Sequence, residues 1–317
     1  MELIGLNDIR RAREVIAGKV HRTPTMTAAS LGKLTGMQLH FKAEVFQKTG
    51  SFKPRGAINK LNSLSDAEKA RGVITISAGN HAAGLAYAAS LSGVKATVVM
   101  PANAVKSKVE ATQGYGATVV LHGDMKGLLP KMQEIQQERG LVYIPPFDDP
   151  YVIAGQGTVG LEIIEDVPAP DVVVVGVGGG GLISGVAAAI KESSPETKVI
   201  GVEAEGATAM LQSLQKNTLV RPETINTIAD GLAAPFVGEH TLAHVQRYVD
   251  DLVLVSDDEI ATALGLILER SKILTEPAGA AAFAALLHHR FEAAPGARVV
   301  CILSGGNVDR SRLKAIL

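Results

Sequence analysis

Residues 172–181 read VVVVGVGGGG, an apolar run that ends in four consecutive glycines. Such a run of valines is typical of a strand that is buried on both faces of a parallel sheet. Residues without a Cβ let the backbone approach an anion closely, and the first turn of a helix offers it free N–H groups. The stretch therefore predicts a strand, then a phosphate-binding turn, then a helix that begins near Leu182. The turn would consist of Gly178, Gly179, Gly180 and Gly181.

The same alternation of strand and helix extends outward from this stretch in both directions. Apolar runs predict strands at 73–77, 96–100, 118–121, 142–144, 172–177, 199–204, 252–256 and 298–303. Between them, helical patterns occupy 80–92, 106–115, 126–139, 155–166, 181–192, 257–272 and 277–290. This order predicts parallel sheets covered by helices. Breaks near 62–65 and at the proline-rich 145–150 indicate two α/β domains with a cleft between them, where ligands bind.

Composition restricts the classes of function. The 317 residues carry 31 Lys+Arg and 32 Asp+Glu, so the net charge of -1 gives no electrostatic case for binding nucleic acid or an anionic membrane. The single cysteine, Cys301, rules out an internal disulfide and a multi-cysteine metal site, and it is expected to be buried and inert. The start of the chain, Met1 to Ile4, has no signal-peptide pattern, so we expect a cytoplasmic protein with no membrane segment.

The glycine run has a competing interpretation. Residues 176–181 also satisfy the G-x-G-x-x-G pattern, and Glu203 follows the next strand, as in proteins that bind a nicotinamide dinucleotide. Lys53 could support a different chemistry, although an ordinary lysine at the start of a helix explains it equally well. It lies in the stretch SFKPRG, and a lysine becomes a nucleophile toward aldehydes when its site lowers its pKa.

Two further strand ends carry small polar residues. Residues 77–81 (SAGNH) and 304–307 (SGGN) each follow a predicted strand, so each could be an anion site. Ordinary helix capping or a plain turn would explain them equally well.

Taken together, these motifs resemble the fold-type II pyridoxal-phosphate enzymes, and within them the serine/threonine dehydratase family and its relative serine racemase. The likeness runs through nearly the whole chain. It is carried by RTP (22–24), QKTGSFK (47–53), SAGNH (77–81), AGQGT (154–158), GGGG (178–181), ADG (229–231), EPAGA (276–280) and SGGN (304–307). It implies a tryptophan synthase beta-like fold with pyridoxal phosphate between two open, twisted parallel-sheet α/β domains. The large cofactor-binding domain would comprise 1–61 plus 147–317, and the small, mobile, substrate-side domain 62–146.

The resemblance also implies roles for single residues. Lys53 would form a Schiff base with pyridoxal 5'-phosphate and act as the catalytic base. The other expected cofactor contacts are Phe52, Asn80, Gly178, Gly179, Gly180, Gly181, Leu182, Gly231, Glu276, Ser304 and Gly305. The substrate carboxylate would be received by Ser77, Ala78, Gly79, Asn80 and His81.

The implied reaction is β-elimination from L-threonine or L-serine, giving 2-oxobutanoate or pyruvate plus ammonia. A serine racemase, or a dehydratase of another β-hydroxy amino acid such as 3-hydroxyaspartate, is the alternative. Ala78 stands where the racemase has its second serine base, which favours the dehydratase. A nicotinamide oxidoreductase would leave Lys53 unexplained, and a silent binding protein would not need it.

Three expectations remain. Relatives bind a divalent metal through a glutamate, a carbonyl and an aspartate. Glu203 and the Ala207 carbonyl match the first two, but Ala209 replaces the aspartate, so a cation there is only weakly indicated. His240 and His244 are expected to form a surface pair, since no acidic partner completes a zinc motif. A homodimer or homotetramer is expected from the resemblance.

Overall fold

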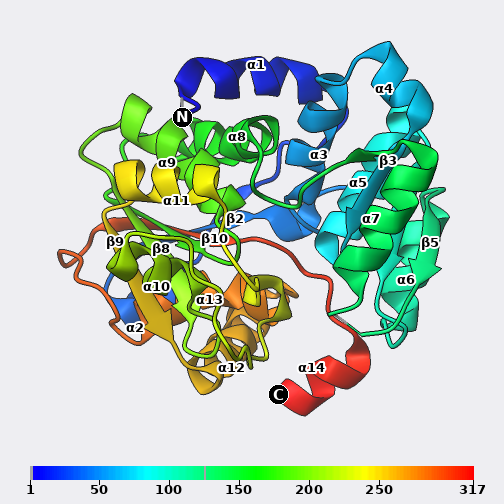
Figure 1. Cartoon of the computed structure of the whole chain (residues 1–317). Helices are drawn as coiled ribbons and strands as arrows, with labels where there is room; N and C mark the ends of the chain where they lie inside the picture. Colours follow the sequence, from blue (N-terminus) through cyan, green and yellow to red (C-terminus); the bar gives the residue numbers. More distant parts are fainter. Residues whose placement is uncertain (1–2, 125) are drawn as a thin grey trace.

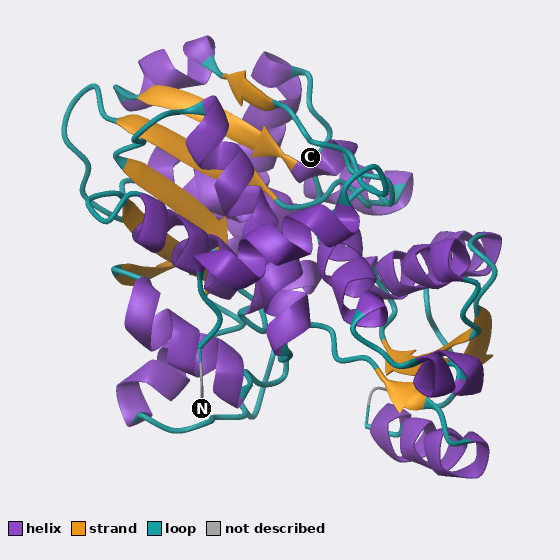
Figure 2. Cartoon of the chain, turned by 90° about the horizontal axis from the view of Figure 1, so that it is seen from above, coloured by secondary structure: helices purple, strands orange, loops and turns teal. Residues whose placement is uncertain are grey.

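The computed structural model describes residues 3–124 and 126–317; Met1 and Glu2, at the start of the chain, lie outside the described residues. The described chain forms two sheets. The six-stranded sheet has the order β1-β2-β10-β7-β8-β9 and the four-stranded sheet the order β5-β4-β3-β6. Figure 2 shows the strands of the two sheets as separate groups. No helix in this part of the chain is long and apolar enough to span a membrane.

The six-stranded sheet combines segments from both halves of the chain. Its strands are β1 (Thr25–Thr27), β2 (Gln38–Ala43), β10 (Arg298–Leu303), β7 (Val172–Gly176), β8 (Lys198–Ala204) and β9 (Asp251–Val255). All neighbours pair in parallel except β1, which runs antiparallel to β2. The predicted strands at 172–177, 199–204, 252–256 and 298–303 are thus present. Apart from the edge pair β1–β2, the sheet is parallel, as expected.

Alternating side chains of β7 show why this strand is apolar throughout. Val172 and Val174 pack on one face with α2 (Ala29–Thr35), α12 (Asp257–Leu266) and α13 (Pro277–Leu287). Val173 and Val175 pack on the other face with α8 (Pro150–Asp166), α9 (Gly181–Ser193) and α11 (Glu239–Tyr248). Figure 1 shows these two groups of helices on opposite sides of β8 and β10. The remaining helical elements here are α1 (Leu6–Ile16), η1 (Glu44–Phe46), α10 (Ala209–Lys216), η2 (Asp230–Leu232), η3 (Ile267–Ser271) and α14 (Arg310–Ile316).

The four-stranded sheet is built entirely from one continuous segment. It contains β3 (Val73–Ile76), β4 (Ala96–Met100), β5 (Thr118–Leu121) and β6 (Val142–Tyr143), all parallel. The helix α5 (Asn80–Ser92) packs on one face and α7 (Leu128–Arg139) on the other. The same segment holds α4 (Asp66–Arg71) and α6 (Lys106–Gly114).

Two elements join the sheets. The helix α3 (Lys53–Asn62) leads out of the six-stranded sheet, and the segment from β6 to α8 leads back. Three helices begin with predicted site residues: α3 with Lys53, α9 with Gly181, and α5, which packs on the smaller sheet, with Asn80. The fold therefore gathers helix N-termini where the sheets meet.

Candidate active site

The four glycines form the turn between β7 and α9. Gly180 has a φ of +91°, a left-handed conformation that favours glycine. Within the described part of the chain, the backbone N–H groups of Gly178, Gly179 and Gly180 have no hydrogen-bond acceptor, and Gly178 and Gly179 are partly exposed. The turn thus presents unpaired N–H donors at the N-terminus of a 13-residue helix, the arrangement that binds a phosphate group.

Phe147 closes one side of this turn. A Cβ on Gly179 would overlap the Phe147 ring, and one on Gly181 would lie 2.9 Å from its Cβ. The ring also packs edge-to-face on Phe236, with centroids 5.6 Å apart. The glycines therefore make room for an aromatic ring as well as for an anion. The sequence prediction did not include Phe147 among the site residues, although it follows the two prolines at the domain boundary.

Lys53 is the first residue of α3, with Pro54 fixing the helix start. Its Nζ donates a hydrogen bond to the Pro146 carbonyl at 2.7 Å and lies 5.1 Å from the centroid of the Phe52 ring. Removal from water lowers the pKa of Lys53 to about 8, and the negative charge of Glu276 opposes this shift. At pH 7 an amine with this pKa is unprotonated, and so free to act as a nucleophile or base, in roughly a tenth of the molecules, far more often than an ordinary lysine.

A chain of side-chain hydrogen bonds connects both sheets beside this lysine. Asn307 donates through Nδ2 to the carbonyl of Thr49 and to Oδ1 of Asn80, both at 2.8 Å. Asn80 in turn donates to Oε1 of Glu276 at 2.7 Å. Both ends of the Asn80 amide are thereby fixed. Burial, followed by the charge of Asp230, raises the pKa of Glu276 to about 7.

The loop that follows β10 completes the site. The N–H of Phe52 donates to the Ser304 carbonyl at 3.1 Å, and the N–H of Gly306 donates to the Gly50 carbonyl at 2.9 Å. This pairing holds the Ser304 loop beside the residue that precedes Lys53. A Cβ on Gly305 would lie 2.8 Å from Glu276 Oε1 and 3.1 Å from Asn80 Nδ2, so Gly305 permits their close approach.

Gly231 links this cluster to the glycine turn. Its carbonyl would be 3.1 Å from a Cβ on Gly178, and a Cβ on Gly231 itself would be 3.5 Å from Glu276 Oε1. Leu182 is buried in the core under α9, so it could offer only its backbone N–H. The structure thus brings together the predicted Lys53, Phe52, Asn80, Gly178–Gly181, Gly231, Glu276, Ser304 and Gly305.

The turn at residues 77–81 is arranged differently from a simple cap. Gly79 is the N-cap of α5 and no side chain caps the helix; the Ser77 hydroxyl accepts the N–H of Gly79 at 3.2 Å. The imidazole of His81, in α5, is buried against the four-stranded sheet, with Nε2 3.1 Å from Thr75 Oγ1 and 3.2 Å from the Ile144 carbonyl. Burial, and then the charge of Lys53, lowers the pKa of His81 to about 3, so the ring is neutral. Only its backbone could face a substrate.

The weakly indicated cation site is occupied by protein donors. Both oxygens of the Glu203 carboxylate accept backbone N–H groups at the start of α10, from Met210 at 2.8 Å and Leu211 at 2.9 Å. Burial raises the pKa of Glu203 to about 7. The described residues contain no group of three or more His, Cys, Asp or Glu that could hold a metal. The Glu203 carboxylate therefore caps the start of α10. Ala209 supplies no second carboxylate beside the Ala207 carbonyl.

One prediction about histidine is wrong. His244 is fully buried: its Nε2 accepts the N–H of Ile4 at 3.0 Å, and its Nδ1 lies 2.6 Å from the His240 carbonyl. The residues before α1 cover this face of α11, which the spacing of the two histidines could not reveal. Cys301, in contrast, is buried in β10 as expected.

The donor set fits pyridoxal phosphate. Unpaired N–H groups at the glycine turn suit the phosphate, the amine of Lys53 suits the aldehyde, and Phe52 supplies an aromatic neighbour. The hydroxyls of Thr49 and Ser51, next to this lysine in sequence, are buried with no hydrogen-bond partner among the described residues. Buried polar groups without a partner require an explanation, and a ligand bound next to Lys53 would supply one.

Comparisons with known proteins agree with this geometry. The profile of the family described as "Pyridoxal-phosphate dependent enzyme" matches residues 16–305. The L-threonine ammonia-lyase of Thermotoga maritima is 46% identical over 316 residues, covering 99% of this chain and 78% of that protein. The catabolic L-threonine dehydratase of Escherichia coli K12 is 44% identical, covering 99% and 96%.

Solved structures show the same likeness. Serine racemase from maize superposes with a TM-score of 0.94 at 40% identity, covering 99% of this chain and 97% of that chain. The processed threonine deaminase isoform 2 of Solanum lycopersicum gives a TM-score of 0.93 at 39% identity, covering 98% and 86%.

Proposed function

The chain belongs to the family of pyridoxal-phosphate dependent enzymes, and on this premise we propose that it converts L-threonine or L-serine into 2-oxobutanoate or pyruvate plus ammonia. It is a lyase, and its cofactor is pyridoxal 5'-phosphate. The observation that carries the proposal is the placement of the Lys53 amine beside the Asn80–Glu276 pair.

We propose the following cofactor contacts. Lys53 would hold the aldehyde carbon covalently through Nζ, and the N–H groups from Gly178 to Leu182 would hold the phosphate. Asn80 would donate to the ring oxygen through its remaining N–H, and Ser304 would face the ring nitrogen. Phe52, Gly231, Glu276 and Gly305 would line the ring. When bound, pyridoxal phosphate supplies the electron sink that stabilises negative charge at the substrate Cα.

The protein's own groups direct the elimination. The turn from Ser77 to His81, at the N-terminus of α5, would receive the substrate carboxylate through its backbone N–H groups. Lys53, released as a free amine, would take the Cα proton onto Nζ. The β-hydroxyl would take up a proton and leave as water, which balances the proton that Lys53 removes from Cα. Water re-enters when the enamine product hydrolyses, so threonine yields 2-oxobutanoate and ammonia with no net change in water.

Ala78 favours this reaction over racemisation. Racemisation needs a second proton-transfer group on the opposite face of Cα, and the methyl group of Ala78 cannot carry a proton. Serine racemase remains the second candidate because the maize enzyme superposes so closely. A dehydratase acting on 3-hydroxyaspartate is the third.

A panel of amino acids separates these candidates. The purified protein with pyridoxal phosphate is given L-threonine, L-serine and 3-hydroxyaspartate, and keto acid and ammonia are measured along with D-serine by chiral chromatography. Keto acid formed chiefly from L-threonine or L-serine supports the proposal. Rapid D-serine formation with little pyruvate would replace it with the racemase.

We also propose that the protein works as a homodimer or homotetramer in the cytoplasm. Light scattering of the purified protein measures the first property, and a monomer at micromolar concentration would contradict it. Fractionation of source cells tests the second.

A further inference from the structure

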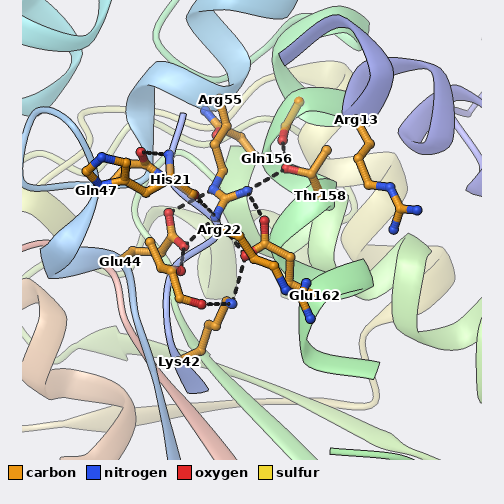
Figure 3. A network of polar contacts seen from close by, with 12 residues as sticks. Arg13, His21, Arg22, Lys42, Glu44, Gln47, Arg55, Gln156, Thr158 and Glu162 are labelled. Atoms are coloured by element: carbon orange, nitrogen blue, oxygen red, sulfur yellow. Dashed lines mark hydrogen bonds and ion pairs between the residues drawn. The ribbon is translucent and has the colours of Figure 1, made fainter. Parts of the chain in front are cut away.

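A buried cluster of charged side chains surrounds the first turn of α3, two residues after Lys53. The Arg55 guanidinium donates from Nε and Nη2 to Glu44 at 2.9 and 2.8 Å, and from Nη1 and Nη2 to Glu162 at 2.7 and 2.9 Å. It also donates to Thr158 Oγ1 at 3.1 Å. Figure 3 shows the guanidinium between the two carboxylates. Arg55 and Glu44 are fully buried.

The cluster contains a second cation, and Asp166 lies at its edge, 3.6 Å from Lys42 Nζ. Lys42, also fully buried, donates to Glu162 at 2.7 Å and to the Thr23 carbonyl at 2.6 Å. The two cations thus face the buried carboxylates of Glu44 and Glu162, with Asp166 as a more exposed third partner. Burial alone would lower the pKa of Arg55, but Glu44 and Glu162 outweigh it and raise that pKa. Burial likewise would raise the pKa of Glu44, but Arg55 holds it below its ordinary value.

Such a cluster is costly to bury, and its benefit is geometric. Desolvation of buried ion pairs can exceed their attraction, so they are weak evidence for stability. The planar fork of arginine, however, fixes direction as well as distance at two carboxylates at once. Glu44 lies just after β2 and Glu162 lies in α8, so a single side chain ties α3 to both elements.

Glycines bring the same helices into backbone contact. A Cβ on Gly155 would lie 2.5 Å from the Arg55 carbonyl, and one on Gly56 would lie 2.7 Å from the Val152 carbonyl. On the far side of α8, a Cβ on Gly157 would lie 2.8 Å from the Gly185 carbonyl in α9. The helix α8 therefore lies between α3 and α9 and sets the distance between them. Lys53 begins α3, and the glycine turn begins α9.

We propose that Arg55, held by Glu44 and Glu162, is a positioning residue that fixes the Lys53 amine relative to the phosphate-binding glycines. All of its acceptors belong to elements on the six-stranded-sheet side. This proposal rests on the proposed role of Lys53 in binding the cofactor.

The test substitutes Arg55→Lys, which keeps the charge but cannot reach both carboxylates with a fork. We expect kcat for L-threonine to fall by about 100-fold, because small displacements of a reacting group have effects of this size. KM should stay near the wild-type value, since the proposed site for the substrate carboxylate is the turn at the N-terminus of α5, which Arg55 does not contact. The dissociation constant for pyridoxal phosphate, measured by titrating the visible absorbance of the bound cofactor, should rise about tenfold as preorganisation is lost.

The matched control is Arg290→Lys. Arg290 also forms a two-point pair with one glutamate, Glu259, but on the surface and far along the chain from α3. It should leave kcat, KM and cofactor affinity unchanged. Far-UV circular dichroism and gel filtration verify that each variant is folded. If Arg55→Lys does not fold, the variant Thr158→Val tests the proposal instead. It removes one hydrogen-bond acceptor of Arg55, so we expect a smaller loss of kcat at constant KM.

The outcomes separate this proposal from the proposed function. Wild-type protein is first reduced with borohydride in the presence of pyridoxal phosphate, and the labelled peptide is identified. If Lys53 is not labelled, the proposed function and this proposal both fail. If Lys53 is labelled but folded Arg55→Lys, or failing that Thr158→Val, matches the wild type in kcat and cofactor affinity, only the positioning role is overturned.

Discussion

Lys53 shows how one residue acquires reactivity from its surroundings. An ordinary lysine amine is almost fully protonated at pH 7, whereas this one is partly removed from water and has a pKa of about 8. The carbonyl of Pro146 accepts one of its N–H groups and points the amine toward the junction of the two sheets. The reactivity therefore arises where α3 begins.

The pH dependence of Lys53 can be measured directly on cofactor-free protein. The rate at which pyridoxal phosphate attaches to Lys53 should rise with pH and level off above a midpoint near 8. Stopped-flow absorbance measures this rate. In Glu276→Gln the midpoint should be lower, because the carboxylate that supports the charged amine is gone. A wild-type midpoint above 10 would show an ordinary lysine.

The raised pKa of Glu276 makes the stability of the folded protein depend on pH. Its pKa is raised from 4.5 to about 7 in the folded protein, so the folded state binds more protons than the unfolded state between these values. Its contribution is fully present below pH 4.5 and is lost as pH rises through 7. Glu276→Gln should therefore raise the free energy of unfolding of the cofactor-free protein at pH 8 by about 1 to 3 kcal/mol.

Urea denaturation at pH 5 and pH 8 tests this prediction. The gain should be clear at pH 8 and small at pH 5, where the native carboxyl is already protonated. Equal changes at both pH values would show that the charge of Glu276 is not responsible.

At the scale of elements, the turn between β7 and α9 is shaped jointly by the glycines and Phe147. Gly179→Ala should destabilise the cofactor-free protein by about 1 to 3 kcal/mol, because the added methyl group overlaps a packed ring. In a Phe147→Ala background the same substitution should cost much less, since the ring is gone. Urea denaturation of the four proteins gives the coupling energy.

Gly114→Ala provides the matched control. Gly114 ends α6 and has nothing within 4 Å of a Cβ, so this change should be neutral or stabilise by about 0.5 to 1 kcal/mol. Additive effects of Gly179→Ala and Phe147→Ala would contradict the contact.

The elements also show what sequence can predict. Apolar strands such as β4 and β7 are identifiable because both faces are buried. The strand β2 was missed because Lys42 interrupts its apolar pattern; that lysine is buried only because a distant glutamate pairs with it. The helix α3 is absent from the predicted helical ranges, since Pro54 and Gly56 are turn residues unless the proline opens a helix.

The motifs of the site can be predicted from the sequence, but the contacts that join these motifs cannot. Lys53, Asn80 and the glycines were identified through local signals and the family resemblance. The contacts of Pro146, Phe147 and Asn307 join segments that lie up to 258 residues apart, and no local pattern encodes such pairs.

At the scale of the molecule, contacts from α6 hold the segment 62–146 against the other sheet. Lys108 Nζ lies 3.1 Å from Asp230, beside Gly231, and Ser107 donates to Asp309 at 2.6 Å. These contacts border a cavity of about 400 Å³ lined by Asn80 and Asn307. We propose that this segment moves as a small substrate-side domain and that α6 helps to close it.

Lys108→Ala should raise KM for L-threonine by up to about fivefold, the effect of losing a partly exposed ion pair. Hydrogen exchange in α6 should also become faster. Lys106→Ala is the matched control, because Lys106 pairs only with Glu110 of its own helix among the described residues. Identical behaviour of the two variants would rule out the closing role.

The two connections between the sheets lie side by side. Asn59, near the end of α3, donates to the Tyr151 carbonyl at 2.8 Å, and Lys60 lies 2.6 Å from Asp149. The chain thus leaves and re-enters the part with the six-stranded sheet at one place. The intervening residues form an inserted segment, and the two ends of the surrounding chain lie next to each other. An inserted segment of this kind can gain or lose length, or be replaced by another segment, without stretching any loop of the surrounding structure. The part of the pocket that this segment contributes, which we propose faces the substrate, can therefore diversify in evolution while the part that holds the lysine and the glycines stays unchanged.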